Sequence, residues 1–389
     1  LNRDFIKQDT KNAAAFAGIF HTIDPDVFID NHVSNGADYQ YTLTHLFTQH
    51  NKLGGALGNY LHQTFMPALE DSLAQKNWDI TPYVNVFNST PDQGFKQFFD
   101  SPRYSTGYTT LFNTLGMMVE THMLKPYKKR VEGTYELMKT FIAIAEKEAE
   151  QIKKLSRYSK SSYPVGGAYP ISWKIDSSKT TRLNFKGYTG TLVSSKVTHS
   201  NRLKYNRNLP FTKKVAYQNY YLPDKKIRIP ESYIVPKGWW RIVELLKLNQ
   251  IEMVPIKKDT IIEATVYKIQ NFKTVQNPYE GHYLHYNTQV SSEKERVQVS
   301  AGDYRITTQQ EGIRYLLETL EPSATDSFFN WNFFDTILQQ KEGFSPYVWE
   351  DKAFELLENN AALQKEFERK KNKDPLFEKN AYEQLDWIH

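Results

Sequence analysis

Apolar and polar residues in the first 157 positions follow the pattern of an α/β domain. Short apolar runs predict two buried strands, at Val27–Asp30 and at Leu115–Val119. After Pro126, apolar residues recur at intervals of three and four, which predicts one long helix with a single buried face. The residues expected on that face are Val131, Tyr135, Met138, Ile142 and Ala145. Strands that alternate with helices in this way indicate an α/β fold.

From residue 158 onward the pattern changes and becomes mainly β. Alternating and β-branched residues predict a series of strands around one short helix at Trp239–Leu248. The expected strands cover residues 191–193, 196–198, 251–256, 260–270 and 296–306. From about Phe328 the sequence is rich in aromatic residues and then helical, with helices expected at 353–357 and 361–371.

These changes divide the chain into three regions. Residues 1–157 form the α/β part, residues 158–327 a β-rich accessory region, and residues 328–389 a helical C-terminal segment. We place the first boundary near Arg157–Tyr163, because Ser, Tyr, Gly and Thr become frequent there.

Composition and charge narrow the classes of function. The chain carries 49 basic and 44 acidic residues, with basic clusters at Lys125–Lys154 and Arg202–Lys226. We interpret both clusters as solvated faces and expect no nucleic-acid partner, because no nucleic-acid-binding motif accompanies them. No apolar run reaches the roughly 18 residues that a transmembrane helix needs, so we expect no membrane span. Since the sequence has no cysteine, any metal has to be held by histidines and carboxylates.

A histidine and two carboxylates lie at the ends of the two predicted strands. His32 follows the first strand by two residues, at the edge where open α/β sheets bind ligands. Asp30 points to the same side of an extended chain and can orient the imidazole. Glu120 ends the second strand, where partial burial can tune a carboxylate as a general base. Taken singly, His32 also fits a structural hydrogen bond, and Glu120 fits the entry to a helix.

An Asn–Arg pair precedes both strands in the sequence. Arg3 can bind a carboxylate with two parallel hydrogen bonds, and Asn2 can add another donor. Taken alone, the pair fits two surface residues equally well.

The order of these features resembles that of the M14 (carboxypeptidase A-like) family of zinc carboxypeptidases, in a bacterial branch. An Asn–Arg pair is followed by a strand ending in His, and then by a strand ending in Glu before a helix with Pro at its start. Residues 28–41, 120–127 and 326–334 carry the similarity, which covers the chain to about residue 157 and, less specifically, the rest. The resemblance implies a carboxypeptidase-like mixed sheet flanked by helices, with its N-terminal part missing from this sequence.

The resemblance also implies a zinc cofactor and two catalytic roles. His32 would be the third zinc ligand, and Glu120 would be the general base that takes a proton from water and passes it to the leaving amine. A zinc ion with three protein ligands keeps a fourth position open for that water.

Further residues would bind the substrate, which the resemblance implies is a peptide or a peptide-like molecule. Asn2 and Arg3 would hold its terminal carboxylate. Tyr104 or Tyr108 would close over it, and Arg103 would add an anion contact.

In this family the other two zinc ligands come from a His-x-x-Glu motif upstream of Asn–Arg, and the sequence begins at Leu1 without that motif. No histidine in the chain is followed three residues later by Glu. We therefore expect a truncated form of an enzyme that binds zinc weakly or not at all, with an exposed sheet edge. Ordinary polar contacts are expected of the remaining nearby histidines, with His122 also a candidate to support Glu120: His21, His45, His50, His62 and His122.

Three functions remain open at this point. The first is a metallocarboxypeptidase that hydrolyses a C-terminal peptide or peptide-like amide bond. The second is a non-catalytic peptidase-like scaffold that binds peptide or glycan through the tyrosines and tryptophans of residues 158–327. The third is a related zinc amidase or deacylase. The resemblance further implies a secreted or periplasmic protein.

Overall fold

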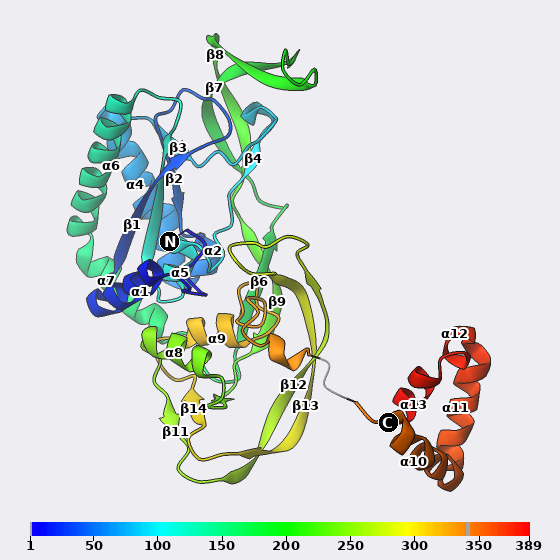
Figure 1. Cartoon of the computed structure of the whole chain (residues 1–389). Helices are drawn as coiled ribbons and strands as arrows, with labels where there is room; N and C mark the ends of the chain where they lie inside the picture. The colour runs from blue at the N-terminus through cyan, green and yellow to red at the C-terminus, as the bar shows by residue number, and fades with distance from the viewer. Residues whose placement is uncertain (1, 340–342) are drawn as a thin grey trace. The chain divides into compact units, whose positions relative to one another are not determined.

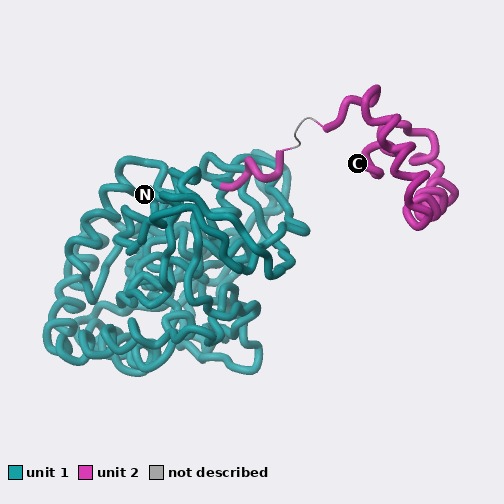
Figure 2. The backbone as a smooth tube through the Cα atoms, turned by 90° about the horizontal axis from the view of Figure 1, so that it is seen from below, with its two compact units in different colours: residues 1–333 teal, residues 334–389 magenta. Residues whose placement is uncertain are grey.

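The computed structural model describes residues 2–339 and 343–389, and it confirms a mixed α/β protein (Figure 1). The chain divides into two compact units, Leu1–Phe333 and Phe334–His389 (Figure 2). The boundary expected near residue 157 lies inside the first unit, within a helix. The boundary expected at residue 328 lies shortly before Phe334, where the second unit begins.

The first unit is built on a mixed four-stranded sheet in the order β1-β5-β2-β3. The strands are β1 (Val27–Ser34), β2 (Leu43–Phe47), β3 (Ile80–Pro82) and β5 (Leu115–His122). Strands β1 and β5 are parallel, β2 runs antiparallel to β5, and β3 is parallel to β2. All eight positions of β5 are buried, as expected for a central strand with both faces covered.

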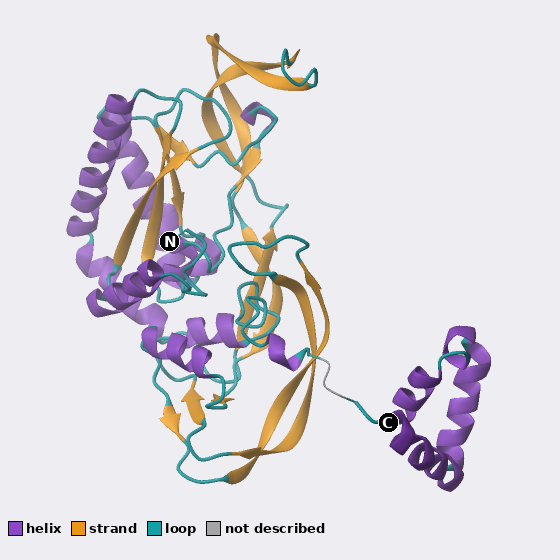
Figure 3. Ribbon diagram, in the orientation of Figure 1, coloured by secondary structure: helices purple, strands orange, loops and turns teal. Residues whose placement is uncertain are grey.

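Helices cover one face of this sheet and form the main hydrophobic core with it (Figure 3). Asn31 of β1 contacts Met138, and Thr121 of β5 bonds Thr134, so the odd-numbered positions of both strands face the helix that carries Met138 and Thr134. The elements of this layer are α2 (His50–Leu53), α3 (Gly55–Tyr60), the π-helix η1 (Leu61–Phe65), α4 (Met66–Gln75), α6 (Tyr127–Lys147) and α7 (Ala149–Lys160).

Strand β1 is longer and more exposed than the sequence pattern predicted. It extends to Ser34 rather than ending at Asp30, so His32 lies within the strand. It is the edge strand of the sheet, and Val33 is 57% exposed. The expected burial of Val27–Asp30 is therefore wrong, because β1 pairs with another strand along one side only.

Helix α6 forms where the sequence predicted it but buries a different face. Its buried residues are Gly133, Leu137, Thr140 and Phe141, whereas Val131, Tyr135 and Ile142 are exposed and Met138 and Ala145 are only partly buried. The physical reason lies at Gly133, which packs so closely on Trp78 that a Cβ atom there would lie 2.8 Å from the indole ring. The helix carries two apolar stripes, and the one with the small residue approaches the core.

The described residues in the rest of the first unit form four smaller sheets, two of which contain a long ribbon of two strands (Figure 3). Strand β8 (Asn201–Gln218) pairs with β7 (Thr181–Ser194) and, at its base, with β4 (Phe95–Lys96). Strands β12 (Thr260–Thr274) and β13 (His285–Val299) form the second ribbon. The other strands are β6 (Ala168–Ile175) with β9 (Tyr221–Arg228), and β10 (Ser232–Val235), β14 (Tyr304–Thr307) and β11 (Val254–Pro255).

Several strand predictions in this region need correction. Residues 196–198 lie in the turn between β7 and β8, residues 251–256 contain only the two-residue β11, and residues 296–306 include the turn between β13 and β14. The predictions at 191–193 and 260–270 are confirmed, as is the helix α8 (Trp240–Leu248). The remaining helices of this unit are α1 (Lys11–Ile23), η2 (Pro91–Gln93), α5 (Ser105–Thr110) and α9 (Ile313–Leu320).

The second unit is helical, as predicted for residues 353–357 and 361–371, but the aromatic run before it is not. Residues 328–333 form turns and belong to the first unit, where Phe328, Phe329 and Trp331 are buried. The helices of the second unit are η3 (Asp335–Ile337), α10 (Pro346–Asn359), α11 (Ala361–Lys373), α12 (Pro375–Glu378) and α13 (Ala381–Ile388). Among the residues described, no helix has the length and apolar character needed to cross a membrane.

Candidate functional site

The structure brings His32, Asp30 and Glu120 together on the sheet face that points away from α6, the face on which α5 lies. His32 and Glu120 are register partners on the parallel strands β1 and β5, so their side chains leave the same face about 5 Å apart at the backbone. Nε2 of His32 lies 2.7 Å from Oδ2 of Asp30, and the Ser105 hydroxyl donates a 2.6 Å hydrogen bond to the same oxygen.

The pKa values of the two carboxylates in this cluster shift in opposite directions. Burial opposes ionisation of Asp30, but hydrogen bonds from His32 and Ser105 outweigh it and lower its pKa. The same bond to Asp30 raises the pKa of His32. Burial, together with the negative charge of Asp30, raises the pKa of Glu120 to about 7, and His32 only partly offsets this. The cluster therefore holds one ionised carboxylate and one that takes up and releases protons near neutral pH.

A basic side chain lies near this cluster. Arg3 bonds Glu280 at 3.1 Å, and its guanidinium also donates to the hydroxyl of Tyr104. The side chain of Arg3 is 40% exposed, and Glu280 is its anionic partner in this structure. Tyr104 directly precedes Ser105, which links this group to Asp30. Asn2, which directly precedes Arg3 in the sequence, is exposed.

Two of the predicted substrate contacts are engaged elsewhere. Arg103 bonds the fully buried Asp326 at 2.7 Å, and its guanidinium packs over the rings of Tyr279 and Trp331. Tyr108 is completely buried and donates a 2.6 Å bond to Asn249. Of the two tyrosines considered for closing over a substrate, the structure places Tyr104 at the site and Tyr108 in the core.

The residues of the cluster do not fit a complete zinc site. His32 has Nε2 on Asp30, which leaves Nδ1 for a metal, and a carboxylate on the second nitrogen is typical of metal-ligating histidines. Tight structural or catalytic zinc binding needs at least three protein ligands. Within residues 2–339 and 343–389, no group of three or more His, Asp or Glu side chains has an arrangement that could hold a metal. We therefore derive no chemical step through zinc.

His122 belongs to a second polar network on the same face. Its Nε2 lies 3.2 Å from Asp38, whose other oxygen accepts a 2.7 Å bond from Arg207 of β8. Its ring stacks on Tyr39 with centroids 4.2 Å apart. Because His122 lies two residues after Glu120 on β5, this network joins the candidate site to the β7–β8 ribbon.

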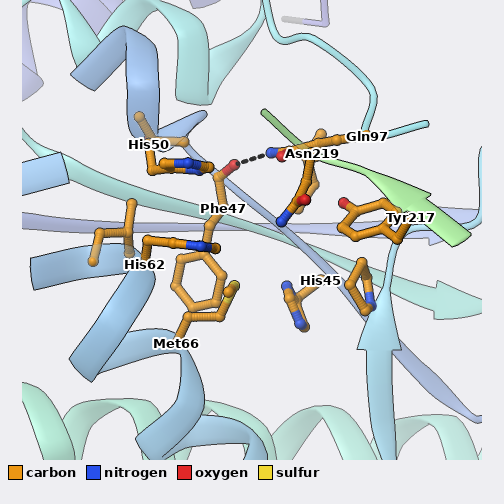
Figure 4. Close-up of a pocket in the computed structure, with 12 residues that line it drawn as sticks. His45, Phe47, His50, His62, Met66, Gln97, Tyr217 and Asn219 are labelled. Atoms are coloured by element: carbon orange, nitrogen blue, oxygen red, sulfur yellow. Dashed lines mark hydrogen bonds between the residues drawn. The ribbon is translucent and has the colours of Figure 1, made fainter. Parts of the chain in front are cut away.

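The other histidines considered from the sequence lie away from this cluster. His21 contacts the hydroxyl of Tyr108 at 3.0 Å. His45, His50 and His62, the last on the π-helix η1, line a small cavity of about 20 Å³, and Figure 4 shows their side chains. His45 bonds Glu70 at 2.7 Å, and the rings of His50 and His62 stack with centroids 4.0 Å apart. Burial and its histidine neighbour lower the pKa of His50 to about 3, so this stack stays neutral.

Sequence reasoning missed three residues of the site. Ser105 completes the hydrogen bonding of Asp30, while Tyr83 lies close enough to Glu120 for burial and that carboxylate to raise its pKa to about 12. Tyr279 approaches Arg3 from a loop far along the chain. Of these three residues, only Ser105 could have been considered from the sequence, because it directly follows the candidate Tyr104.

Comparisons with known proteins add no relative to this picture. No family model matches the chain, and neither a curated protein nor a solved structure was found that matches it.

Proposed function

We propose that the chain binds the C-terminal carboxylate of a peptide or peptide-like substrate and takes part in hydrolysis of the adjoining amide bond. The observation that carries this proposal is the grouping of Glu120, whose pKa is about 7, with the Asp30–His32 pair and the partly exposed Arg3, whose partner Glu280 a substrate carboxylate would replace. A base that titrates near neutral pH beside an anion-binding group suits an exopeptidase. The resemblance to M14 carboxypeptidases supports the same assignment.

In the proposed reaction each residue has one task. Arg3 holds the substrate carboxylate with charge-assisted hydrogen bonds, and the Tyr104 hydroxyl beside it contributes a further contact. Glu120 in its ionised form accepts a proton from the attacking water and returns it to the leaving amine. Asp30 fixes the orientation of His32, which is the residue we propose as a metal ligand. A metal-dependent activity needs ligands beyond those that the described residues bring together.

Binding and hydrolysis can be tested separately. Titration calorimetry with a short peptide acid and its C-terminal amide should show a preference for the acid, because only the acid offers a carboxylate to Arg3. Arg3→Gln should remove the preference, weakening binding about tenfold or more, whereas the exposed Arg296→Gln should leave it unchanged. Equal binding of the acid and the amide by the parent protein would overturn the proposed carboxylate contact.

Hydrolysis is then measured with and without added zinc, and zinc content is determined in parallel. We expect any amide-bond cleavage to fall at least a hundredfold in Glu120→Gln, which keeps the shape of the side chain but cannot act as a base. If the parent binds the peptide acid and cleaves nothing under either condition, the chain is a peptide-binding scaffold.

A further inference from the structure

The β7–β8 ribbon, residues 181–218, has an extreme charge distribution. It contains eight basic residues and no aspartate or glutamate. Three of the eight form ion pairs with residues outside the ribbon, Lys186 with Asp79, Arg207 with Asp38 and Lys213 with Asp92. The other five are exposed, and none of them forms an ion pair within the described part of the chain: Arg182, Lys196, Arg202, Lys204 and Lys214.

The outer half of the ribbon projects beyond the end of the central sheet (Figure 1). Its strands pair with each other from Thr189↔Asn206 to Ser194↔Asn201, whereas β4 pairs with β8 only at Tyr217 and Gln218. No other described strand pairs with this outer half, so both of its edges are open, while Gly190 and Tyr205 on one face lie against Thr90 and Ser89.

The outer half also carries exposed apolar side chains. Leu192 is 67% exposed, and Val197 in the turn is 86% exposed. Leu192 is the register partner of Leu203, so both leave one face of the ribbon. Arg202 and Lys204 leave the opposite face, and Lys196 lies in the turn beside Val197. The outer half therefore combines exposed apolar side chains on one face and in the turn with cations on the opposite face and in the turn.

We propose that the tip of this ribbon binds the surface of a membrane that contains anionic lipids. Cations on the ribbon would contact headgroup phosphates, and Leu192 and Val197 would enter the boundary between headgroups and acyl chains. A single-stranded nucleic acid is a poorer fit, because such sites stack bases on exposed aromatic rings. The aromatic residue of the outer half, Tyr205, is partly buried and bonds the carbonyl of Ser89.

The number of cations at the tip of the ribbon gives the expected strength of membrane binding. A lysine or arginine near an anionic membrane contributes about 1 kcal/mol, roughly a fivefold gain in binding. Removing the three cations of the tip should therefore weaken binding about a hundredfold. Increasing the salt concentration should have a similar effect, because the interaction is screened within about 10 Å.

The test measures sedimentation of the full chain with vesicles of phosphatidylcholine, with and without phosphatidylglycerol. We expect binding to the anionic vesicles that is lost in the triple variant Lys196→Gln, Arg202→Gln and Lys204→Gln. A matched control, Lys257→Gln, Lys258→Gln and Lys273→Gln, removes the same charge from exposed positions outside the ribbon and should bind as the parent does. Circular dichroism of both variants establishes that they are folded.

A second variant distinguishes binding to a lipid surface from binding to any other polyanion. Leu192→Ser with Val197→Ser keeps every charge, so it should lose vesicle binding several-fold and should not differ from the parent in an assay with soluble single-stranded DNA. The proposal is overturned if neutral and anionic vesicles bind equally or if the triple variant binds like the parent. It is also overturned if the serine variant keeps full vesicle binding, since the ribbon would then be a general polyanion site.

Discussion

At the scale of single residues, the candidate site depends on two carboxylates with opposite environments. Asp30 accepts bonds from His32 and Ser105 and stays ionised, whereas Glu120 is buried beside it without a comparable set of donors. The sequence placed His32 and Glu120 at the ends of two apolar runs, and the structure pairs these runs as neighbouring strands. It could not distinguish Arg3 from Arg103 or Tyr104 from Tyr108, because their surroundings come from residues 249 to 331.

The raised pKa of Glu120 predicts how stability depends on pH. Its pKa is 4.5 in an unfolded chain and about 7 in the native state. Between those values the native state binds more protons than the unfolded state, so the free energy of unfolding falls as pH rises. The shift corresponds to roughly 3 kcal/mol, fully lost above about pH 8. Urea unfolding at pH 5 and pH 8 should show this loss in the parent protein and a smaller one in Glu120→Gln. An identical pH dependence in both proteins would contradict the assigned pKa.

The pairing of Arg103 with Asp326 predicts a structural role for Arg103. Removing the guanidinium leaves a completely buried carboxylate without its charge partner, which costs about 3–5 kcal/mol. Arg103→Gln should therefore lower thermal stability strongly, while the exposed Arg296→Gln changes it little. If Arg103→Gln were as stable as the parent but bound the peptide acid more weakly, Arg103 would be a substrate contact, as the resemblance first implied.

At the scale of elements, periodicity located α6 but not the face that it buries. Two apolar stripes satisfy the same spacing of three and four, and the sequence pattern favoured the one with the larger side chains. Packing selected the other stripe, because Gly133 allows the helix to approach Trp78 closely. In the same way the apolar run Val27–Asp30 predicted a strand, but its place at the edge of the sheet is set by pairing with a strand that begins at Leu115, far along the chain.

The two faces of α6 can be distinguished by mutation. Gly133→Leu adds a side chain where even a Cβ atom lies 2.8 Å from the Trp78 ring, so we expect a loss of about 1–3 kcal/mol or more in the free energy of unfolding. Tyr135→Ala removes a ring that is 67% exposed, and it should change stability by about 0.5 kcal/mol or less. Chemical denaturation measures both changes. A large loss in Tyr135→Ala with little change in Gly133→Leu would restore the buried face predicted from the sequence.

At the scale of the whole molecule, composition and periodicity predicted a mixed α/β protein with a helical C-terminal segment. They did not predict the two long ribbons, because strand pairing in a hairpin depends on register and turn geometry that the alternation of residues leaves open. They also placed the aromatic run 328–333 with the C-terminal helices. In the structure these rings complete the first unit, where Phe328 packs against Tyr315 and Trp331 donates to Asp326.

Each compact unit has its own core, which predicts two separable unfolding transitions. In the first unit Phe65 is fully buried in the core under the central sheet. In the second, Phe367 is 8% exposed and packs on Phe377 and Trp387, with ring centroids 6.0 and 5.7 Å away. Truncating either phenylalanine to alanine removes about 3–5 kcal/mol from its own core. In calorimetry Phe65→Ala should lower the transition of the larger unit, and Phe367→Ala should lower that of the smaller one. If both variants shifted a single common transition, the chain would unfold as one cooperative structure rather than two.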